Sequence, residues 1–325
     1  MARKKKRRLK LKSSFKRFLV YFIFFFCMGI YSIIECKKIY DEFKYRETYE
    51  YKITEIGYSK EETKKLIEKL PNEELDKILK EEYNENYYHI IKQKYYMQKN
   101  FNKYLEYKEY HEDTSYEDII AIVNVKANIG WYNETFKSNT KDDLLVLVNK
   151  FYYLDENYVR DDIKNISLAY SYHGNSASSI VIENFEKMRD EVEEILGIRL
   201  MINTSYRSYK DQKKVYDNFK TVSLKYADSY AARPGHSEHQ TGLSIDITSL
   251  EHQNINEFKT SEEYTWLKEN CHKYGFILRY PEGKEHITGY NNESLHFRYV
   301  GEKIAKQIYE EKITFDEYYA YYIAK

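Results

Sequence analysis

The sequence predicts an α+β domain, a small mixed or antiparallel sheet with flanking helices, that follows one transmembrane helix and a mostly helical spacer. Three observations support this prediction. Residues 18–34 form an uncharged apolar run. Polar, partly helical segments then continue to about residue 115. Beyond them, strand-like and helix-like runs mix without regular alternation, which favours α+β over a doubly wound sheet.

Charge is unevenly distributed along the chain. Lys and Arg number 52, as do Asp and Glu, but residues 1–17 hold ten basic residues and no acidic one. The rest of the chain therefore has 42 basic residues against 52 acidic ones. An acidic body argues against nucleic acid as a partner, because phosphate binding requires a basic surface.

The apolar run of residues 18–34 is near the shortest helix that crosses a hydrocarbon core of about 30 Å. Basic residues are concentrated on its N-terminal side, so the positive-inside rule places residues 1–17 in the cytoplasm. We therefore expect a single-pass protein of the cell membrane with its globular part outside the cell. A cleaved signal peptide is the alternative, but residues 33–35 (Ile-Ile-Glu) match a small-residue cleavage site poorly.

Five segments follow from these patterns: a basic tail (1–17), a membrane anchor (18–34), a helical spacer (35–115), the main domain (116–313) and a helical tail (314–325). In the spacer, Ser59 and Glu62 have capping-box spacing, and Thr260 and Glu263 repeat it in the main domain. Strands are predicted at residues 119–125, 144–150, 200–206, 242–248 and 295–300. Helices are predicted at about residues 181–195, 261–274 and 302–311.

A polar segment near the middle of the main domain contains two candidate metal ligands, His239 and Asp246. Residues 243, 245 and 247 are apolar and should face the core, which places Asp246 on the opposite side of the strand. An acid within a strand has poor β propensity and is commonly satisfied by a cation or a hydrogen-bond network. A surface-facing aspartate is the alternative interpretation.

A second polar segment contains Glu293 and His296. Two histidines and one carboxylate are sufficient for a catalytic zinc that keeps a fourth position for water. A further carboxylate that does not bind the metal is needed as a general base. Taken singly, Glu293 could be a turn acid and His296 a half-buried core histidine. His236 is a rival to His239 as a ligand.

Three polar motifs follow one another along the main domain. The first has Tyr206, Arg207, Ser208 and Gln212. The second has Arg233, Pro234, Gly235, Ser237, His239, Gln240, Gly242 and Asp246, and the third has Glu293 and His296. In this order they resemble the motifs of the VanY-type D-alanyl-D-alanine carboxypeptidases, a family of zinc peptidases with L,D-carboxypeptidase and VanX-type relatives. The resemblance covers roughly residues 115–313.

The resemblance implies one Zn²⁺ per chain and assigns a role to each matching residue. The metal ligands would be His239, Asp246 and His296. The catalytic residues would be Glu293, as general base, and Arg207. The substrate pocket would contain Arg207, Gln212 and Ser237. Leu295 departs from the family pattern, which has tryptophan before the last histidine.

The resemblance thus implies a zinc-dependent carboxypeptidase that removes C-terminal D-alanine from peptidoglycan stem peptides. One alternative is an L,D-carboxypeptidase that acts on tetrapeptides. The other is a non-catalytic wall-binding or sensor protein on the same scaffold. Glu293 argues against the latter, because a binding module has no need of a general base.

Overall fold

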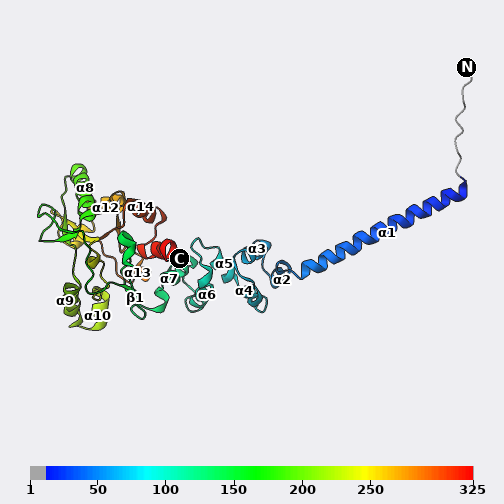
Figure 1. Ribbon diagram of the computed structural model, residues 1–325, viewed down its shortest axis with the longest axis horizontal. Helices are drawn as coiled ribbons and strands as arrows, with labels where there is room; N and C mark the ends of the chain where they lie inside the picture. The colour runs from blue at the N-terminus through cyan, green and yellow to red at the C-terminus, as the bar shows by residue number, and fades with distance from the viewer. Residues whose placement is uncertain (1–11, 325) are drawn as a thin grey trace, which may run out of the picture. The chain divides into compact units, whose positions relative to one another are not determined.

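The structure is a computed structural model that describes residues 12–324. Most of the basic segment 1–17 therefore lies outside the described residues. The chain divides into two compact units, Met1–Lys92 and Gln93–Lys325 (Figure 1). The second unit begins ahead of residue 116, where we predicted the main domain to start.

The first unit contains a long apolar helix followed by four short ones. α1 (Ser13–Arg46) has no buried residue. Among the residues that the structure describes, it is the one helix long and apolar enough to cross a membrane. The capping box predicted for Ser59 and Glu62 is confirmed, with both reciprocal hydrogen bonds present. The remaining helices are α2 (Tyr49–Ile56), α3 (Lys60–Lys69), α4 (Asn72–Ile78) and α5 (Glu85–Ile91).

The second unit is built around a four-stranded antiparallel sheet with the order β5-β6-β8-β7. Two small two-stranded sheets accompany it, one parallel (β1-β2) and one antiparallel (β3-β4). The predicted α+β class is therefore confirmed. The strands of the main sheet are β5 (Leu200–Thr204), β6 (Ser244–Ser249), β7 (Phe276–Leu278) and β8 (His296–Tyr299). The short strands are β1 (Phe136–Lys137), β2 (Tyr152–Tyr153), β3 (Ile163–Asn165) and β4 (Ser176–Ser178).

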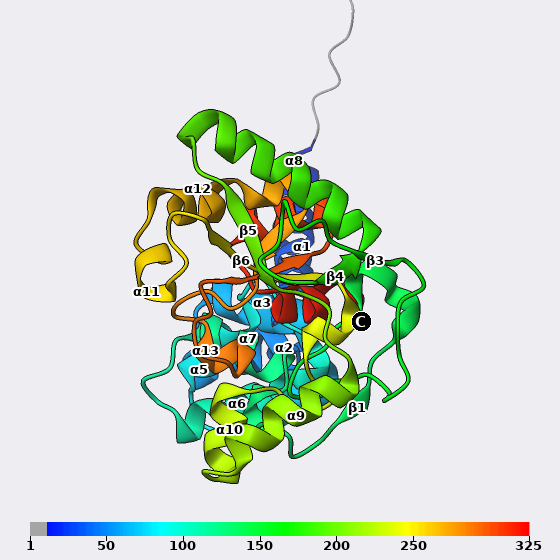
Figure 2. The same ribbon diagram turned by 90° about the vertical axis from the view of Figure 1, so that its left-hand side faces the viewer.

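Helices surround the main sheet. Figure 2 shows α8 at one end of this unit and the α9–α10 pair at the other, with β5 and β6 between them. The α-helices are α6 (Phe101–Tyr110), α7 (Tyr116–Asn124), α8 (Ser179–Leu196), α9 (Tyr209–Lys220), α10 (Leu224–Tyr230), α11 (Ile255–Phe258), α12 (Glu262–Asn270), α13 (Glu285–Thr288), α14 (Glu302–Glu311) and α15 (Phe315–Tyr318). The short 3₁₀ and π turns are η1 (Gln98–Asn100), η2 (Ala127–Ile129), η3 (Thr140–Leu145), η4 (Glu238–Thr241), η5 (Cys271–Tyr274) and η6 (Tyr319–Ile323).

The main core lies between α8 and one face of the sheet. Residues of α8 at helical spacing are buried there together with alternate residues of β6. Because side chains alternate along a strand, the residues between them face the other way. This confirms the predicted alternation around Asp246. The core residues contributed by these two elements are Val181, Phe185, Met188, Val192, Ile245 and Ile247, and Leu243 precedes β6.

Two predicted strands are wrong. Residues 119–124 lie in helix α7 and Val125 is its C-cap, because the Ser115 side chain accepts a hydrogen bond from the Asp118 backbone N–H and caps a helix. Residues 144–150 are not a strand either. Their backbone is satisfied by a side chain instead of a neighbouring strand, since Arg298 donates to the carbonyls of Leu144 and Val146.

One further difference concerns a helix end. Ser261, and not Thr260, caps α12, by accepting from the Tyr264 backbone N–H. The segment after α14 is helical over α15 and η6, and it is buried in a second core. Its buried members include Phe315, Tyr318 and Tyr321.

Candidate metal centre

The structure brings His239, Asp246 and His296 together, with one potential ligand atom of each lying within 4.8 Å of the others. Asp246 on β6 and His296 on β8 are direct partners in the antiparallel ladder. Directly paired residues point to the same face of a sheet. His239 reaches the same place from η4, and its ring lies edge-on to that of His296, with centroids 4.8 Å apart.

A tight turn precedes η4 and fixes the direction from which His239 approaches. Gly235 has a φ of +86°, and a Cβ at this position would lie 2.8 Å from the carbonyl oxygen of Leu154. Only glycine adopts this conformation here without strain. The Arg207 N–H then donates to the His239 carbonyl at 3.1 Å and ties η4 to the loop after β5. The turn and this hydrogen bond together place the His239 ring.

The donor set fits a metal ion. Nε2 of His239 lies 3.5 Å from Oδ2 of Asp246, and Nδ1 of His296 lies 3.1 Å from Oδ1. Bonds of about 2.0–2.2 Å to one tetrahedral ion would hold their ligand atoms roughly 3.4 Å apart. Two imidazoles and one carboxylate are also the donor types that zinc prefers.

The pKa values of this cluster reflect burial and mutual contact. Burial lowers the pKa of His239 to about 3 despite the neighbouring Asp246. Burial would raise the pKa of Asp246, but His239 and His296 outweigh it and hold this pKa at about 2. Burial would lower the pKa of His296, yet the neighbouring carboxylates of Asp246 and Glu238 raise it to about 9. A metal ion at His296 would therefore displace a proton.

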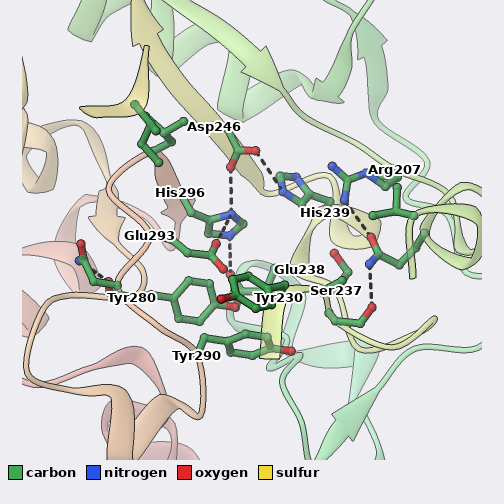
Figure 3. A pocket seen from close by; sticks show the side chains of 17 residues that line it. Arg207, Tyr230, Ser237, Glu238, His239, Asp246, Tyr280, Tyr290, Glu293 and His296 are labelled. Atoms are coloured by element: carbon green, nitrogen blue, oxygen red, sulfur yellow. Dashed lines mark hydrogen bonds and ion pairs between the residues drawn. The ribbon is translucent and has the colours of Figure 1, made fainter. Parts of the chain in front are cut away.

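Glu293 lies beside the cluster and is not part of it. Its Oε2 is 3.9 Å from Nδ1 of His296. Desolvation within the pocket, together with the carboxylates of Asp246 and Glu238, raises its pKa, although His296 opposes this shift. Figure 3 shows the Glu293 carboxylate next to the His296 ring. Glu293 is therefore a candidate proton acceptor beside the cluster.

Arg207 lines the same pocket on the far side of His239 from Glu293 (Figure 3). Its Nη1 donates to Oε1 of Gln212 at 2.9 Å, and Gln212 in turn donates to the Ala232 carbonyl at 2.7 Å. Burial lowers the pKa of the guanidinium, and Asp246 and Glu293 oppose that shift. Gln212 thus holds the orientation of Arg207.

The pocket has a volume of about 310 Å³. Ser237 and Leu295 line it, and Leu295 also packs against the main core. Aromatic rings form much of its wall, from Tyr230, Tyr280 and Tyr290. His236 lies outside it, because its Nδ1 is 2.8 Å from the Asn149 carbonyl oxygen and its ring packs against Tyr132 and Tyr153.

Three charged residues beside the cluster were not predicted from the sequence: Glu238, Arg279 and Arg298. All three side chains are fully buried, and Glu238 forms ion pairs with both arginines. The available signal was an arginine inside each of two apolar strand-like runs, residues 276–280 and 296–300. A buried charge in such a position requires a partner, as it does at Asp246.

Comparisons with known proteins agree with this geometry. The family model described as VanY, D-alanyl-D-alanine carboxypeptidase, matches residues 174–302. YodJ of Bacillus subtilis (strain 168) is 39% identical over 55% of this chain and 67% of that protein. The D-alanyl-D-alanine carboxypeptidase of Enterococcus faecium is 31% identical over 54% of this chain and 57% of its own length.

Among solved structures, the LdcB LD-carboxypeptidase is 34% identical with a TM-score of 0.54, covering 57% of this chain and 90% of that one. The match to the VanY model includes the positions from Arg207 to His296. The chain belongs to the VanY family of D-alanyl-D-alanine carboxypeptidases.

Proposed function

We propose that the chain is a zinc-dependent carboxypeptidase that removes C-terminal D-alanine from peptidoglycan stem peptides. The observation that carries this proposal is the convergence of His239, Asp246 and His296 in a pocket that also contains Glu293 and Arg207. A purely structural metal site would not need the adjacent carboxylate of Glu293, which does not belong to the ligand set. The description of the matching family supports the substrate class.

One Zn²⁺ would be held by His239, Asp246 and His296. When bound, it supplies a Lewis acid that lowers the pKa of water from about 15.7 to near 7. Glu293 takes up the proton of the attacking water and returns it to the leaving amine. Its raised pKa suits this exchange, because a general base works best when its pKa approaches the working pH.

Arg207 and the pocket wall position the peptide. The planar guanidinium suits a carboxylate, which it can bind through two parallel hydrogen bonds. Because Arg207 and Glu293 lie on opposite sides of the cluster, a terminal carboxylate at Arg207 would direct the scissile amide toward Glu293. Gln212 holds Arg207 in place, and Ser237 provides a hydroxyl at the pocket wall.

A second candidate activity is L,D-carboxypeptidase action on tetrapeptides. The likeness to the LdcB LD-carboxypeptidase favours it, whereas the family description and the Enterococcus faecium relative favour D,D cleavage. Leu295 lines the pocket where the family pattern has tryptophan. A smaller wall at this point changes the space beside the scissile bond and therefore bears on the choice between the two peptides.

Helix α1 supports a location at the cell membrane. It is long and apolar enough to span a bilayer, which also fits a signal sequence. We propose that it is a single-pass anchor with residues 1–17 inside the cell, because basic residues precede it. Residues 35–115 then act as a spacer, and residues 116–313 carry the catalytic groups outside the cell.

The test is release of D-alanine by the purified full-length chain in detergent micelles. A pentapeptide ending in D-Ala-D-Ala and a tetrapeptide ending in a single D-alanine are offered separately, with and without a zinc chelator. We expect chelator-sensitive release from the pentapeptide. Release from the tetrapeptide alone would assign the L,D activity. No release from either peptide by the zinc-loaded chain would reject the enzymatic proposal.

A further inference from the structure

Two buried arginines converge on one carboxylate directly behind the metal cluster. Arg279 directly follows β7, Arg298 lies on β8, and neither side chain has exposed surface. Oε1 of Glu238 is 2.7 Å from Nε of Arg279 and 3.0 Å from Nη1 of Arg298. One oxygen of this carboxylate is thus occupied by both guanidinium groups.

The other oxygen of Glu238 faces a metal-site histidine. Oε2 accepts a hydrogen bond from the Ser244 hydroxyl at 3.1 Å and lies 3.4 Å from Nε2 of His296. The other ring nitrogen of His296, Nδ1, lies 3.1 Å from Asp246. The His296 ring is therefore held between two carboxylates, one inside the metal cluster and one behind it, as the dashed lines in Figure 3 show.

The carboxylate of Glu238 is itself firmly anchored. Nη1 of Arg279 is 2.6 Å from Oδ2 of Asp316 on α15, and Asn149 donates to the other oxygen of Asp316 at 2.7 Å. Arg298 donates to two backbone carbonyls of the segment before Asn149. Each guanidinium group is thus held by Glu238 and by a second set of buried partners. Neither can turn away from Glu238 without breaking buried hydrogen bonds.

We propose that Glu238 is a positioning residue for His296. It accepts the proton of Nε2, and this fixes the tautomer in which the lone pair of Nδ1 points into the metal cluster. A hydrogen bond to the second ring nitrogen commonly sets which nitrogen of a histidine binds a metal. The inference rests on the proposed metal centre and extends it to Arg279, Arg298 and Asp316.

The test compares zinc affinity in two matched variants of the full-length chain in detergent, measured by competition with a chelating dye. Glu238→Gln keeps the size of the side chain but removes its charge. Glu263→Gln is the control, because Glu263 is equally buried and accepts from Ser249 and from His252 at 2.7 Å outside the metal cluster. We expect zinc affinity to fall about 10- to 100-fold for Glu238→Gln and to stay unchanged for Glu263→Gln.

Equal zinc affinity in Glu238→Gln and the wild type would overturn the proposal. Failure of the wild type to bind zinc would instead reject the metal centre itself. If Glu238→Gln does not fold, ¹⁵N-histidine spectra of the zinc-loaded wild type test the proposal instead. The His296 signals are identified by their absence from the spectra of His296→Gln. A proton on Nε2 with the chemical shift of an N–H hydrogen-bonded to a carboxylate supports the proposal. A proton on Nδ1, or an Nε2 proton without that shift, contradicts it.

Discussion

Asp246 and Glu293 are carboxylates of the same pocket with opposite pKa shifts. Burial raises the pKa of both, but contacts with His239 and His296 outweigh burial at Asp246 and bring its pKa to about 2. At Glu293 the nearby negative charges add to burial, and its pKa is raised. Such a separation suits Asp246 to remain an anion and Glu293 to act as the proton acceptor that we propose.

Replacing Glu293 by glutamine should abolish turnover without loss of zinc. The amide keeps the shape of the side chain but cannot take up a proton, and loss of a general base typically costs about 10²- to 10⁴-fold in rate. Release of D-alanine and zinc content are measured on the same preparation. Turnover within tenfold of the wild type would reject Glu293 as the base.

Replacing His239 or His296 by alanine should lower the zinc content of the purified chain. Each change removes one of three proposed ligands, so we expect well below one zinc per chain by elemental analysis. His252→Ala is the control, because His252 contacts Glu263 and lies outside the cluster. Full zinc content in His239→Ala would remove this residue as a ligand.

At this scale the sequence predicted which residues meet but not what holds them. The motif spacing identified His239, Asp246 and His296, because the family pattern assigns each of these positions. Glu238 was overlooked although it is adjacent to His239. Its partners Arg279 and Arg298 lie 41 and 60 positions along the chain, and the pairing depends on strands β7 and β8 being neighbours. Sequence spacing alone does not contain that information.

Among the elements, amphipathic helices and alternating strands were predicted well, whereas short buried segments were not. Residues 119–125 are almost uniformly apolar and β-branched, so the same run fits a buried strand or a buried helix. The cap at Ser115 decides for the helix. Residues 144–150 have strand composition, but the Arg298 guanidinium occupies the carbonyls that a neighbouring strand would bond.

The turn before η4 gives a prediction about backbone geometry. Gly235→Ala should destabilise the fold by more than about 2 kcal/mol, since a positive φ alone costs an L-residue about 1–2 kcal/mol and the new Cβ would also meet the Leu154 carbonyl. Gly283→Ala is the matched control, with a φ of +81° and open space around its Cβ.

Urea unfolding monitored by circular dichroism measures both variants. We expect Gly235→Ala to unfold at a clearly lower urea concentration than Gly283→Ala. Equal midpoints would show that the close approach of residue 235 to the Leu154 carbonyl does not limit which residue fits at this turn. Zinc affinity provides a second measurement, because a displaced turn would move His239 and weaken binding in Gly235→Ala only.

For the molecule as a whole, metal binding should contribute to stability. A ligand that binds only the folded state stabilises it by about 2.7 kcal/mol when its free concentration is 100 times its Kd. Removing zinc with a chelator should therefore lower the thermal midpoint of the wild type but not that of His296→Ala. An identical midpoint with and without chelator in the wild type would contradict a site formed by folded residues.

The anchor can be tested by fractionation of cells that express the full-length chain. If α1 stays attached and spans the bilayer, the chain should remain in the membrane pellet after an alkaline carbonate wash. Its intact mass should include residues 1–34. A soluble product that begins after residue 34 would instead support a cleaved signal sequence. The control is a variant lacking residues 1–36, which should remain in the supernatant.

The two faces of strand β6 have different roles. Its residues Ile245 and Ile247 fill the core, while Asp246 on the opposite face belongs to the candidate metal cluster. A single-residue insertion or deletion inside β6 would exchange these faces, and an apolar side chain would then replace the Asp246 carboxylate at the cluster. When distant relatives are aligned, a gap placed within this strand is therefore an error. Grafting of new loops onto this scaffold has to leave residues 243–247 at their natural length.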